Sequence, residues 1–159
     1  MKVNLLCVGD AKGPLRSAIV EYEKRVCRYW RFQVFEVEAG VGKGRKVDEE
    51  KVRRAEEDRL LGRLPGGSGG LAALTRTGVA LGSRALAEFM AEQALRSVQE
   101  MTFVIGGAFG LGTGILERST LRLSLSAMTL PHEFARLLLA EQLYRAGTIL
   151  RNEPYHKGP

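Results

Sequence analysis

Cysteine and histidine are scarce in this sequence, which has two of each among 159 residues. Cys7 and Cys27 are too few for a framework of disulfide bonds, and Cys7 stands in an apolar run where a small buried side chain is expected. The four residues are also widely dispersed, and none of their spacings is typical of a metal site. The sequence therefore predicts a protein without a disulfide framework and without a bound metal.

Long apolar runs and dense basic runs are also missing. The apolar stretch from Val3 to Val8 is too short for the core of a signal peptide or for a membrane span, which predicts a cytoplasmic protein without membrane contact. The net charge is +6, but the basic residues are spread along the chain rather than gathered in an import-type or heparin-type cluster. A basic surplus of this size favours a polyanionic partner, usually a nucleic acid, although an inert basic surface would have the same composition.

The composition that is present is that of an ordinary globular domain. Hydrophobic residues make up 45% and charged residues 26%, and the length fits one domain over residues 1–159. No internal repeat is visible. The glycine-rich segment 65–70 is either a flexible linker or a surface loop insertion, and the low cost of lengthening a loop favours the second reading. We therefore expect no domain boundary there.

Short apolar runs typical of strands alternate with longer segments whose apolar residues recur at helical spacing. The predicted strands are 2–8, 33–38, 71–75, 101–105 and 121–125. Helices are predicted from Pro14, over 47–63, from an N-cap at Ser83 to Gln99, over 113–119 and from Pro131, with a basic loop at 39–45. This alternation predicts an α/β fold with a mostly parallel sheet and helices on both faces.

A glycine-rich loop, residues 106–112 (GGAFGLG), follows the predicted strand 101–105. Glycines there permit positive φ angles and a close approach of the main chain to a ligand. The loop lacks the Gly-Lys-Ser/Thr ending of a phosphate-binding loop, and no carboxylate stands at 124–129, where a dinucleotide-binding fold requires one. A tight turn that only joins strand to helix remains an alternative.

A second loop, residues 126–131, follows the strand 121–125 and precedes the last helix. Ligands of open α/β sheets bind at the carboxyl ends of the strands, which is where both loops are expected. The small and hydroxyl residues of this loop leave main-chain N–H groups available for an adenine edge and a ribose, and the loop has no cation for a phosphate. The pattern favours a nucleoside-type ligand without phosphates, such as S-adenosylmethionine.

Four C-terminal motifs resemble those of a known family of RNA-modifying enzymes. They are 105–111 (IGGAFGL), 125–132 (LSAMTLPH), 141–146 (EQLYRA) and 154–157 (PYHK), and the segments 3–9 and 21–25 also fit. The chain is similar, nearly end to end, to the ribosomal RNA large subunit methyltransferase H family of the SPOUT class. The resemblance implies a C-terminal trefoil knot, which no periodicity predicts, S-adenosyl-L-methionine as cofactor, and a homodimer.

The resemblance also implies the reaction, methylation of N3 of a pseudouridine in the helix 69 region of 23S rRNA on assembled ribosomes. Two alternatives stay open, a SPOUT methyltransferase for another rRNA or tRNA base and a non-catalytic ribosome-binding factor. The sequence departs from the family at Arg76, which is expected to alter the rim of the pocket. By correspondence with the family's motifs, the cofactor contacts are Leu74, Gly106, Leu125, Ser126, Ala127, Met128, Thr129 and Leu130.

The C-terminal region concentrates side chains suited to this chemistry. Loss of the imide proton from N3 creates the nucleophile that attacks the methyl group in line. His156 is the preferred general base because the unperturbed pKa of histidine lies near neutrality. Tyr155 is predicted to stack on the base, and Arg145 to stabilise the developing negative charge. Arg151 and Lys157 are predicted to contact RNA phosphates.

Structural alternatives exist for the same residues. Glu141 and Arg145 stand four residues apart on a helix, where a salt bridge is favoured, and His132 at a helix start is expected to cap or pack. The tail, residues 154–157, is alternatively a frayed terminus. A tail this short cannot build a site alone, so we expect it to complete a site across the dimer interface, beside the partner's cofactor loop.

Overall fold

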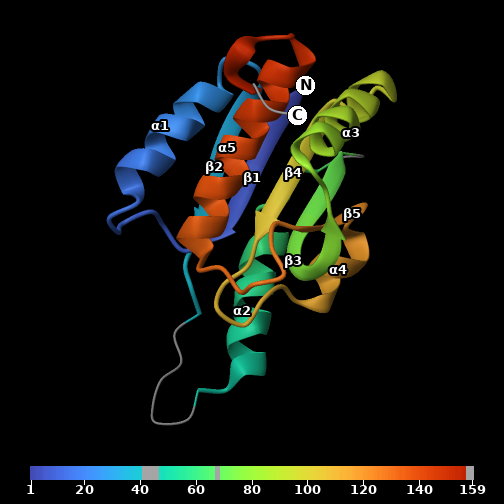
Figure 1. Cartoon of the computed structure of the whole chain (residues 1–159). Helices are drawn as coiled ribbons and strands as arrows, with labels where there is room; N and C mark the ends of the chain where they lie inside the picture. The colour runs from blue at the N-terminus through green and yellow to red at the C-terminus, as the bar shows by residue number, and fades with distance from the viewer. Residues whose placement is uncertain (41–46, 67–68, 157–159) are drawn as a thin grey trace.

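Strands and helices alternate along residues 1–40, 47–66 and 69–156, which the computed structural model describes, with only the main chain at 156 (Figure 1). The predicted basic loop at 39–45 therefore lies mostly outside the described residues. None of the helices in the described part of the chain combines the length and apolar content that a membrane span requires. The elements are β1 (Lys2–Val8), α1 (Arg16–Val26), β2 (Arg31–Val37), α2 (Glu49–Leu61), β3 (Gly70–Ala80), α3 (Ser83–Leu95), β4 (Glu100–Ile105), α4 (Thr113–Arg118), β5 (Leu121–Ser124), α5 (His132–Leu150) and the 3-10 turn η1 (Pro154–His156).

The strands form one parallel sheet in the order β2-β1-β4-β3-β5. Cys7 on β1 lies opposite Ile105 on β4, and Ala73 on β3 lies opposite Val104. The carboxyl ends of β1, β4, β3 and β5 therefore meet at one edge of the sheet. The predicted parallel α/β sheet is confirmed.

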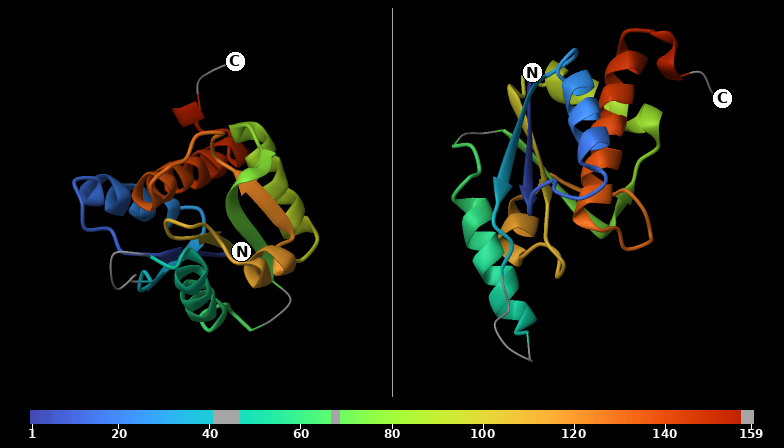
Figure 2. Two further views of the ribbon diagram at one scale, coloured as in Figure 1. Left: turned by 90° about the horizontal axis from the view of Figure 1, so that it is seen from below. Right: turned by 90° about the vertical axis from the view of Figure 1, so that its left-hand side faces the viewer.

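The two faces of the sheet carry separate hydrophobic clusters, and Figure 2 shows helices on both sides of the sheet. Alternate residues of a strand point to opposite faces, so Leu5 packs in one cluster and Leu6 in the other. Met90 of α3 and Leu139 of α5 join the first cluster, whereas Leu60 of α2 joins the second, together with α4. Helices α1, α3 and α5 thus cover one face and α2 and α4 the other, which confirms the predicted helices on both faces.

The third strand is longer than predicted because it pairs with β5 twice. Leu74 and Val79 both lie opposite Leu123, so the residues between them bulge out of the ladder. A Cβ atom on Gly78 would lie 2.5 Å from the carbonyl oxygen of Arg122, so glycine alone permits this close approach of two backbones. The predicted strand over 71–75 was therefore wrong at its carboxyl end, where β3 continues to Ala80.

The predicted ends of α3 were also wrong. Gly82 holds the N-cap position, and the Ser83 hydroxyl donates to Gln142 Oε1 at 2.7 Å instead of capping the helix. The tertiary contact with α5 thus outcompetes the local cap. The helix ends at Leu95 rather than Gln99, because Ser97 adopts a left-handed conformation with φ of 60°.

A buried ion pair fastens α5 to its neighbours. Arg136 is only 5% exposed. Its Nε atom donates to Glu23 of α1 at 2.7 Å, and Nη1 donates to Glu36 of β2 at 2.5 Å. Burial lowers the pKa of the guanidinium, but the two carboxylates outweigh burial and hold it above its ordinary value. The charged arginine therefore joins three elements in a place where an apolar side chain would normally pack.

We expect Arg136→Met to lower the free energy of unfolding by about 3 kcal/mol, because it leaves two carboxylates without their shared cation. Urea unfolding followed by circular dichroism measures the loss. The matched control is Arg54→Met, since Arg54 pairs with Glu50 at 2.8 Å on the solvated side of α2, where a pair contributes roughly 0.5 kcal/mol or less. Equal losses in the two variants would contradict a special role for Arg136.

Candidate active site

The two loops singled out in the sequence lie at the same edge of the sheet. The loop 106–112 follows β4, and the loop 125–131 follows β5. β3 lies between these two strands, and its Leu74 pairs with Leu123 near the carboxyl end of β5. The structure thus places Leu74, Gly106 and the loop after β5 around one end of the sheet, as predicted for a ligand site of an open α/β fold.

The loop after β4 is a tight turn folded back on itself. The N–H of Gly110 donates to the carbonyl of Gly107 at 3.1 Å, and Gly110 has a positive φ of 77°. A Cβ atom on Gly106 would lie 2.8 Å from the carbonyl carbon of Gly110 and 3.0 Å from Leu111 Cδ2. The space on this side of Gly106 is therefore filled by the loop itself, and a side chain would force the loop open.

Hydroxyl groups organise the loop after β5. Ser124 Oγ donates to the carbonyl of Ser126 at 3.0 Å and lies 3.2 Å from that of Arg76 on the β3 bulge. The N–H of Met128 donates to Ser126 Oγ at 3.0 Å, so it is not free for a ligand, contrary to the expectation for this loop. Arg76 Nη1 donates to Thr129 Oγ1 at 3.3 Å, which places the unusual arginine at the rim of the loop, as predicted.

The predicted cofactor residues differ in how exposed they are. Leu125 and Leu130 pack against the hydrophobic cluster beneath α5, whereas Ala127 and Thr129 are exposed and the Met128 side chain is 77% exposed. Apart from Arg76 at the rim, no cation stands within either loop. The lack of further cations in the two loops fits a ligand that carries no phosphate.

His132, the first residue of α5, packs against the loop after β1. Its Nε2 atom lies 2.8 Å from where a Cβ atom of Gly9 would stand, and Gly9 has a positive φ of 84°. The neighbouring Glu133 accepts hydrogen bonds from the N–H groups of Lys12 and Gly13 at 3.1 and 3.0 Å. The predicted packing role of His132 is confirmed.

The C-terminal tail docks on α1 and α5 rather than fraying. Tyr155 Oη donates to Glu141 Oε1 at 3.2 Å, and it lies 3.2 Å from the Tyr22 hydroxyl. The ring of Tyr155 meets that of Tyr144 edge to face at 4.6 Å. Arg145 lies over the Tyr155 ring at 4.8 Å and donates to Glu141 from Nε at 3.0 Å, which confirms the predicted salt bridge. The alternative of a frayed terminus is wrong for Pro154 and Tyr155.

Burial and hydrogen bonding keep two tyrosines protonated, Tyr155 of the tail and Tyr29 before β2. Burial, followed by the contact with the Tyr22 hydroxyl and the charge of Glu141, raises the pKa of Tyr155. Burial and the hydrogen bond to Glu153 raise the pKa of Tyr29 to about 12, and Arg151 lies over the Tyr29 ring at 5.0 Å. The hydroxyl of Tyr155 is therefore a donor at neutral pH and unsuited to act as a base.

One chain does not bring the tail to the loops. Helix α5 has 19 residues, which corresponds to a length of about 28 Å, and it starts at the second loop and ends at the tail. In Figure 1, α5 runs from the end of the sheet where both loops lie to its opposite end. Tyr155 and Arg145 therefore cannot reach the loops of their own chain. The side chain of His156 and all of Lys157 lie outside the described residues.

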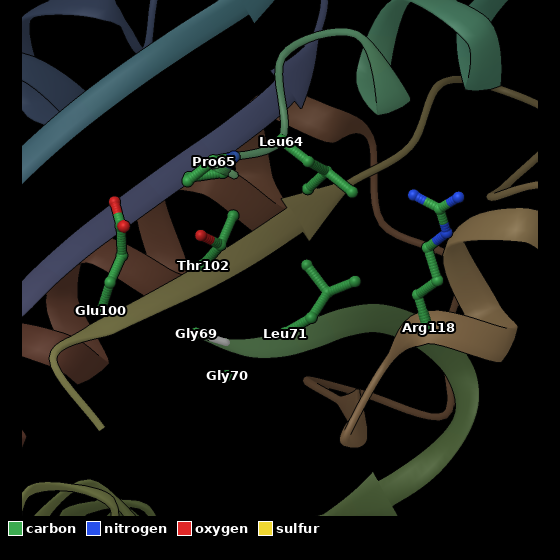
Figure 3. A pocket seen from close by; sticks show the side chains of 8 residues that line it. All are labelled: Leu64, Pro65, Gly69, Gly70, Leu71, Glu100, Thr102 and Arg118. Atoms are coloured by element: carbon green, nitrogen blue, oxygen red, sulfur yellow. The ribbon is translucent and has the colours of Figure 1, made fainter. Parts of the chain in front are cut away.

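Cavities in the described residues lie elsewhere. Figure 3 shows one of about 270 Å³ near the amino ends of β3 and β4, with Glu100, Thr102 and Arg118 in its lining. A second hollow of about 410 Å³ lies between the end of β2 and α2. Neither coincides with the loops 106–112 and 125–131. The described residues also contain no group of three or more His, Cys, Asp or Glu placed to hold a metal ion.

Comparison with known proteins decides the family. Residues 1–156 match the sequence model of the family described as "Predicted SPOUT methyltransferase". The chain belongs to this SPOUT methyltransferase family. It is 46% identical over 158 residues to the Ribosomal RNA large subunit methyltransferase H of Gemmatimonas aurantiaca, covering 99% of this chain and 100% of the relative. It is 43% identical to the protein of the same name from Syntrophotalea carbinolica, covering 98% and 99%.

A solved structure supports the fold of this SPOUT methyltransferase. A probable methylase family protein from Haemophilus influenzae Rd KW20 superposes with a TM-score of 0.54 at 12% identity, over 98% of this chain and 70% of that chain. At this identity the likeness concerns the fold alone. The family resemblance predicted from the four C-terminal motifs is confirmed by the family match and the two relatives.

The sequence analysis of this SPOUT methyltransferase missed two residues at the first loop. Glu56 and Glu57 of α2, which was predicted as an exposed amphipathic helix, lie against Gly107 and Gly112. A signal was present, because Glu56 stands four residues after Val52 and four before Leu60, in the middle of the buried stripe of α2. A carboxylate in an apolar stripe indicates a polar contact inside the fold.

Proposed function

We propose that this protein transfers a methyl group from S-adenosyl-L-methionine to N3 of a pseudouridine in 23S rRNA, in the helix 69 region of assembled ribosomes. Membership of the SPOUT methyltransferase family supports the methyl donor. Full-length identity to proteins named Ribosomal RNA large subunit methyltransferase H supports rRNA as the substrate. The observation that carries the proposal is the pair of loops at one edge of the sheet, neither of which contains a cation for a phosphate.

The donor site uses main chain more than side chains. Leu74 lines the adenine pocket, and the loop Leu125, Ser126, Ala127, Met128, Thr129 and Leu130 holds the adenine edge. Gly106 lets the methionine end of the donor pass close to the backbone, and the tight turn leaves no room for a side chain at this residue. The position of Arg76 beside Thr129 leaves a guanidinium at the rim, facing the expected path of a polyanion.

The chemistry needs an aligned nucleophile and a dry site. The bound donor supplies an electrophilic methyl group. His156 removes the imide proton from N3, and Tyr155 stacks on the pseudouridine while keeping its own proton, in keeping with its raised pKa. Arg145 stabilises the negative charge that develops on the carbonyl oxygens. Arg151 and Lys157 hold the RNA backbone through phosphates.

The active site is shared between two copies of the chain. The outer face of α5 carries Phe134, Leu138, Glu141 and Arg145 at helical spacing, and the first two side chains are 53% and 36% exposed. The apolar side chains Phe134, Leu138 and Met128 form a surface beside the second loop. A two-fold pairing along this face places the tail of one protomer beside the loops of its partner. Within one chain, the length of α5 keeps the tail away from the loops.

The remaining features follow from the family resemblance. We assign residues 1–159 to one domain in the cytoplasm, where ribosomes are found, and we assign a trefoil knot to the C-terminal third.

Methyl transfer to defined substrates tests the function. The purified protein is expected to bind the donor in calorimetry and to methylate pseudouridine in intact ribosomes, with naked 23S rRNA at least about tenfold less reactive, because RNA of this kind is recognised by shape. Mass spectrometry of nuclease digests locates the methyl group. Transfer to tRNA or to a different rRNA base would contradict the assigned substrate, and absence of donor binding would contradict the proposed methyltransferase activity.

A further inference from the structure

Helix α2 presents a carboxylate at a position where its neighbours are apolar. Val52 and Leu60 of the same stripe are buried, and Glu56 between them is only 3% exposed. An ionised carboxylate accepts hydrogen bonds only, and its burial without donors is strongly unfavourable. The site around Glu56 therefore has to supply donors.

One oxygen of Glu56 is satisfied and the other is not. Oε1 accepts from the N–H of Gly40 at 2.9 Å, just after β2. Oε2 is buried and has no hydrogen-bond partner among the residues that the structure describes. Buried acceptors without a partner are rare in native structures, and this one leaves Oε2 free to interact with the main chain that packs on it.

The carboxylate lies directly beneath the glycine loop. A Cβ atom on Gly107 would stand 2.6 Å from both oxygens of Glu56, so the main chain of the loop rests on the carboxylate. The other end of the loop has a similar support, because Glu57 Oε1 accepts from the N–H of Ile115 at 3.1 Å and lies against Gly112. Two adjacent carboxylates of α2 thus hold the beginning and the end of the loop 106–112.

We propose that Glu56 is a positioning residue for the methyl donor: its carboxylate, fixed to Gly40 through Oε1, packs against Gly107 and holds the turn 107–109 in the shape that binds the donor. This inference rests on the proposed function. Glu56 touches the loop rather than the reacting atoms, so it sets donor affinity more than the rate of transfer. Glu57 provides the second support by capping α4.

The test compares Glu56→Gln with Glu50→Gln, an exposed glutamate of the same helix. Glutamine keeps an oxygen that accepts from the N–H of Gly40. In place of Oε2 it has an NH2 group, which faces the N–H donors of the loop. We expect amide hydrogen exchange of residues 106–112 in the ligand-free protein to accelerate about tenfold, and the donor Kd to rise about tenfold. The kcat at saturating donor is expected to stay within about threefold, and Glu50→Gln to match the parent protein.

Gly107→Ala provides an independent variant should Glu56→Gln fail to fold. Its methyl group pushes the loop off the carboxylate, so a similar rise in Kd is expected, and the two changes combined are expected to be non-additive. Parent-like loop exchange and donor affinity in either variant would overturn the proposal. If the parent protein binds no donor, the proposed function fails, while the exchange rates still decide whether Glu56 holds the loop.

Discussion

Gly106→Val is expected to abolish binding of S-adenosylmethionine, with a loss of affinity of at least about 100-fold. Even the Cβ atom of the new side chain would stand 2.8 Å from the carbonyl carbon of Gly110 and 2.9 Å from its oxygen. Both atoms belong to the backbone of the tight turn, which cannot move aside as a flexible side chain would. The loop therefore opens, and the surface that receives the methionine end of the donor is lost. Isothermal titration calorimetry measures the effect.

The control for Gly106→Val is Gly66→Val. Gly66 has no heavy atom within 4 Å of its expected Cβ position, so the same change there is expected to leave donor binding intact. Circular dichroism and the urea midpoint of both variants show whether the sheet persists. Parent-like affinity of a folded Gly106→Val protein would refute the placement of the donor at this loop.

His156→Ala is expected to lower the rate of methyl transfer at least about 100-fold while the donor Kd stays within about twofold, because a general base contributes roughly 10²–10⁴ in rate. The donor is held by loops at the other end of α5, so truncating the tail's imidazole removes chemistry without disturbing that pocket. Single-turnover methylation of ribosomes separates the chemical step from product release. A fully active variant would show that the tail has no chemical part.

Mixed dimers locate the tail in the assembly. In an equimolar mixture of Gly106→Val and His156→Ala chains, a heterodimer has one site with intact loops from one chain and an intact tail from the other. A shared site therefore recovers about a quarter of the parent activity after random pairing, whereas a site built within one chain recovers none. Tyr155→Phe serves as a milder tail variant, since the ring keeps its contact with Tyr144 and loses only the hydroxyl bonds.

Local patterns predicted the elements well where burial decides them. The strand Lys2–Val8 carries apolar side chains on both faces, such as Leu5 and Leu6, because both faces of the central strands are covered, and the predicted range was correct. Errors arose where a distant residue competes with a local rule. Ser83 was expected to cap its helix and instead bonds to Gln142, 59 residues away. β3 runs past its predicted end because Val79 pairs again with Leu123.

The candidate site shows the same division. Glycines and small hydroxyl residues after two buried strands predicted both loops and their common edge, because carboxyl ends of parallel strands meet there. The support beneath the first loop was missed, since a glutamate in a charged helix ordinarily faces water and only the packing of α2 brings Glu56 to Gly107. The motif at 154–157 indicated a functional tail but not the length of α5 that separates it from the loops.

By itself, the sequence determined the alternation of strands and helices, the two loops free of phosphate-binding cations, and the SPOUT methyltransferase family. These properties reside in local periodicity and in short contiguous motifs, which a linear reading contains. The tertiary structure alone decided the strand order, the burial of Arg136 and Glu56, and the distance between the tail and the loops. Each of these depends on contacts between residues far apart in the chain. Such contacts contribute free energy only once the helices have packed on the sheet.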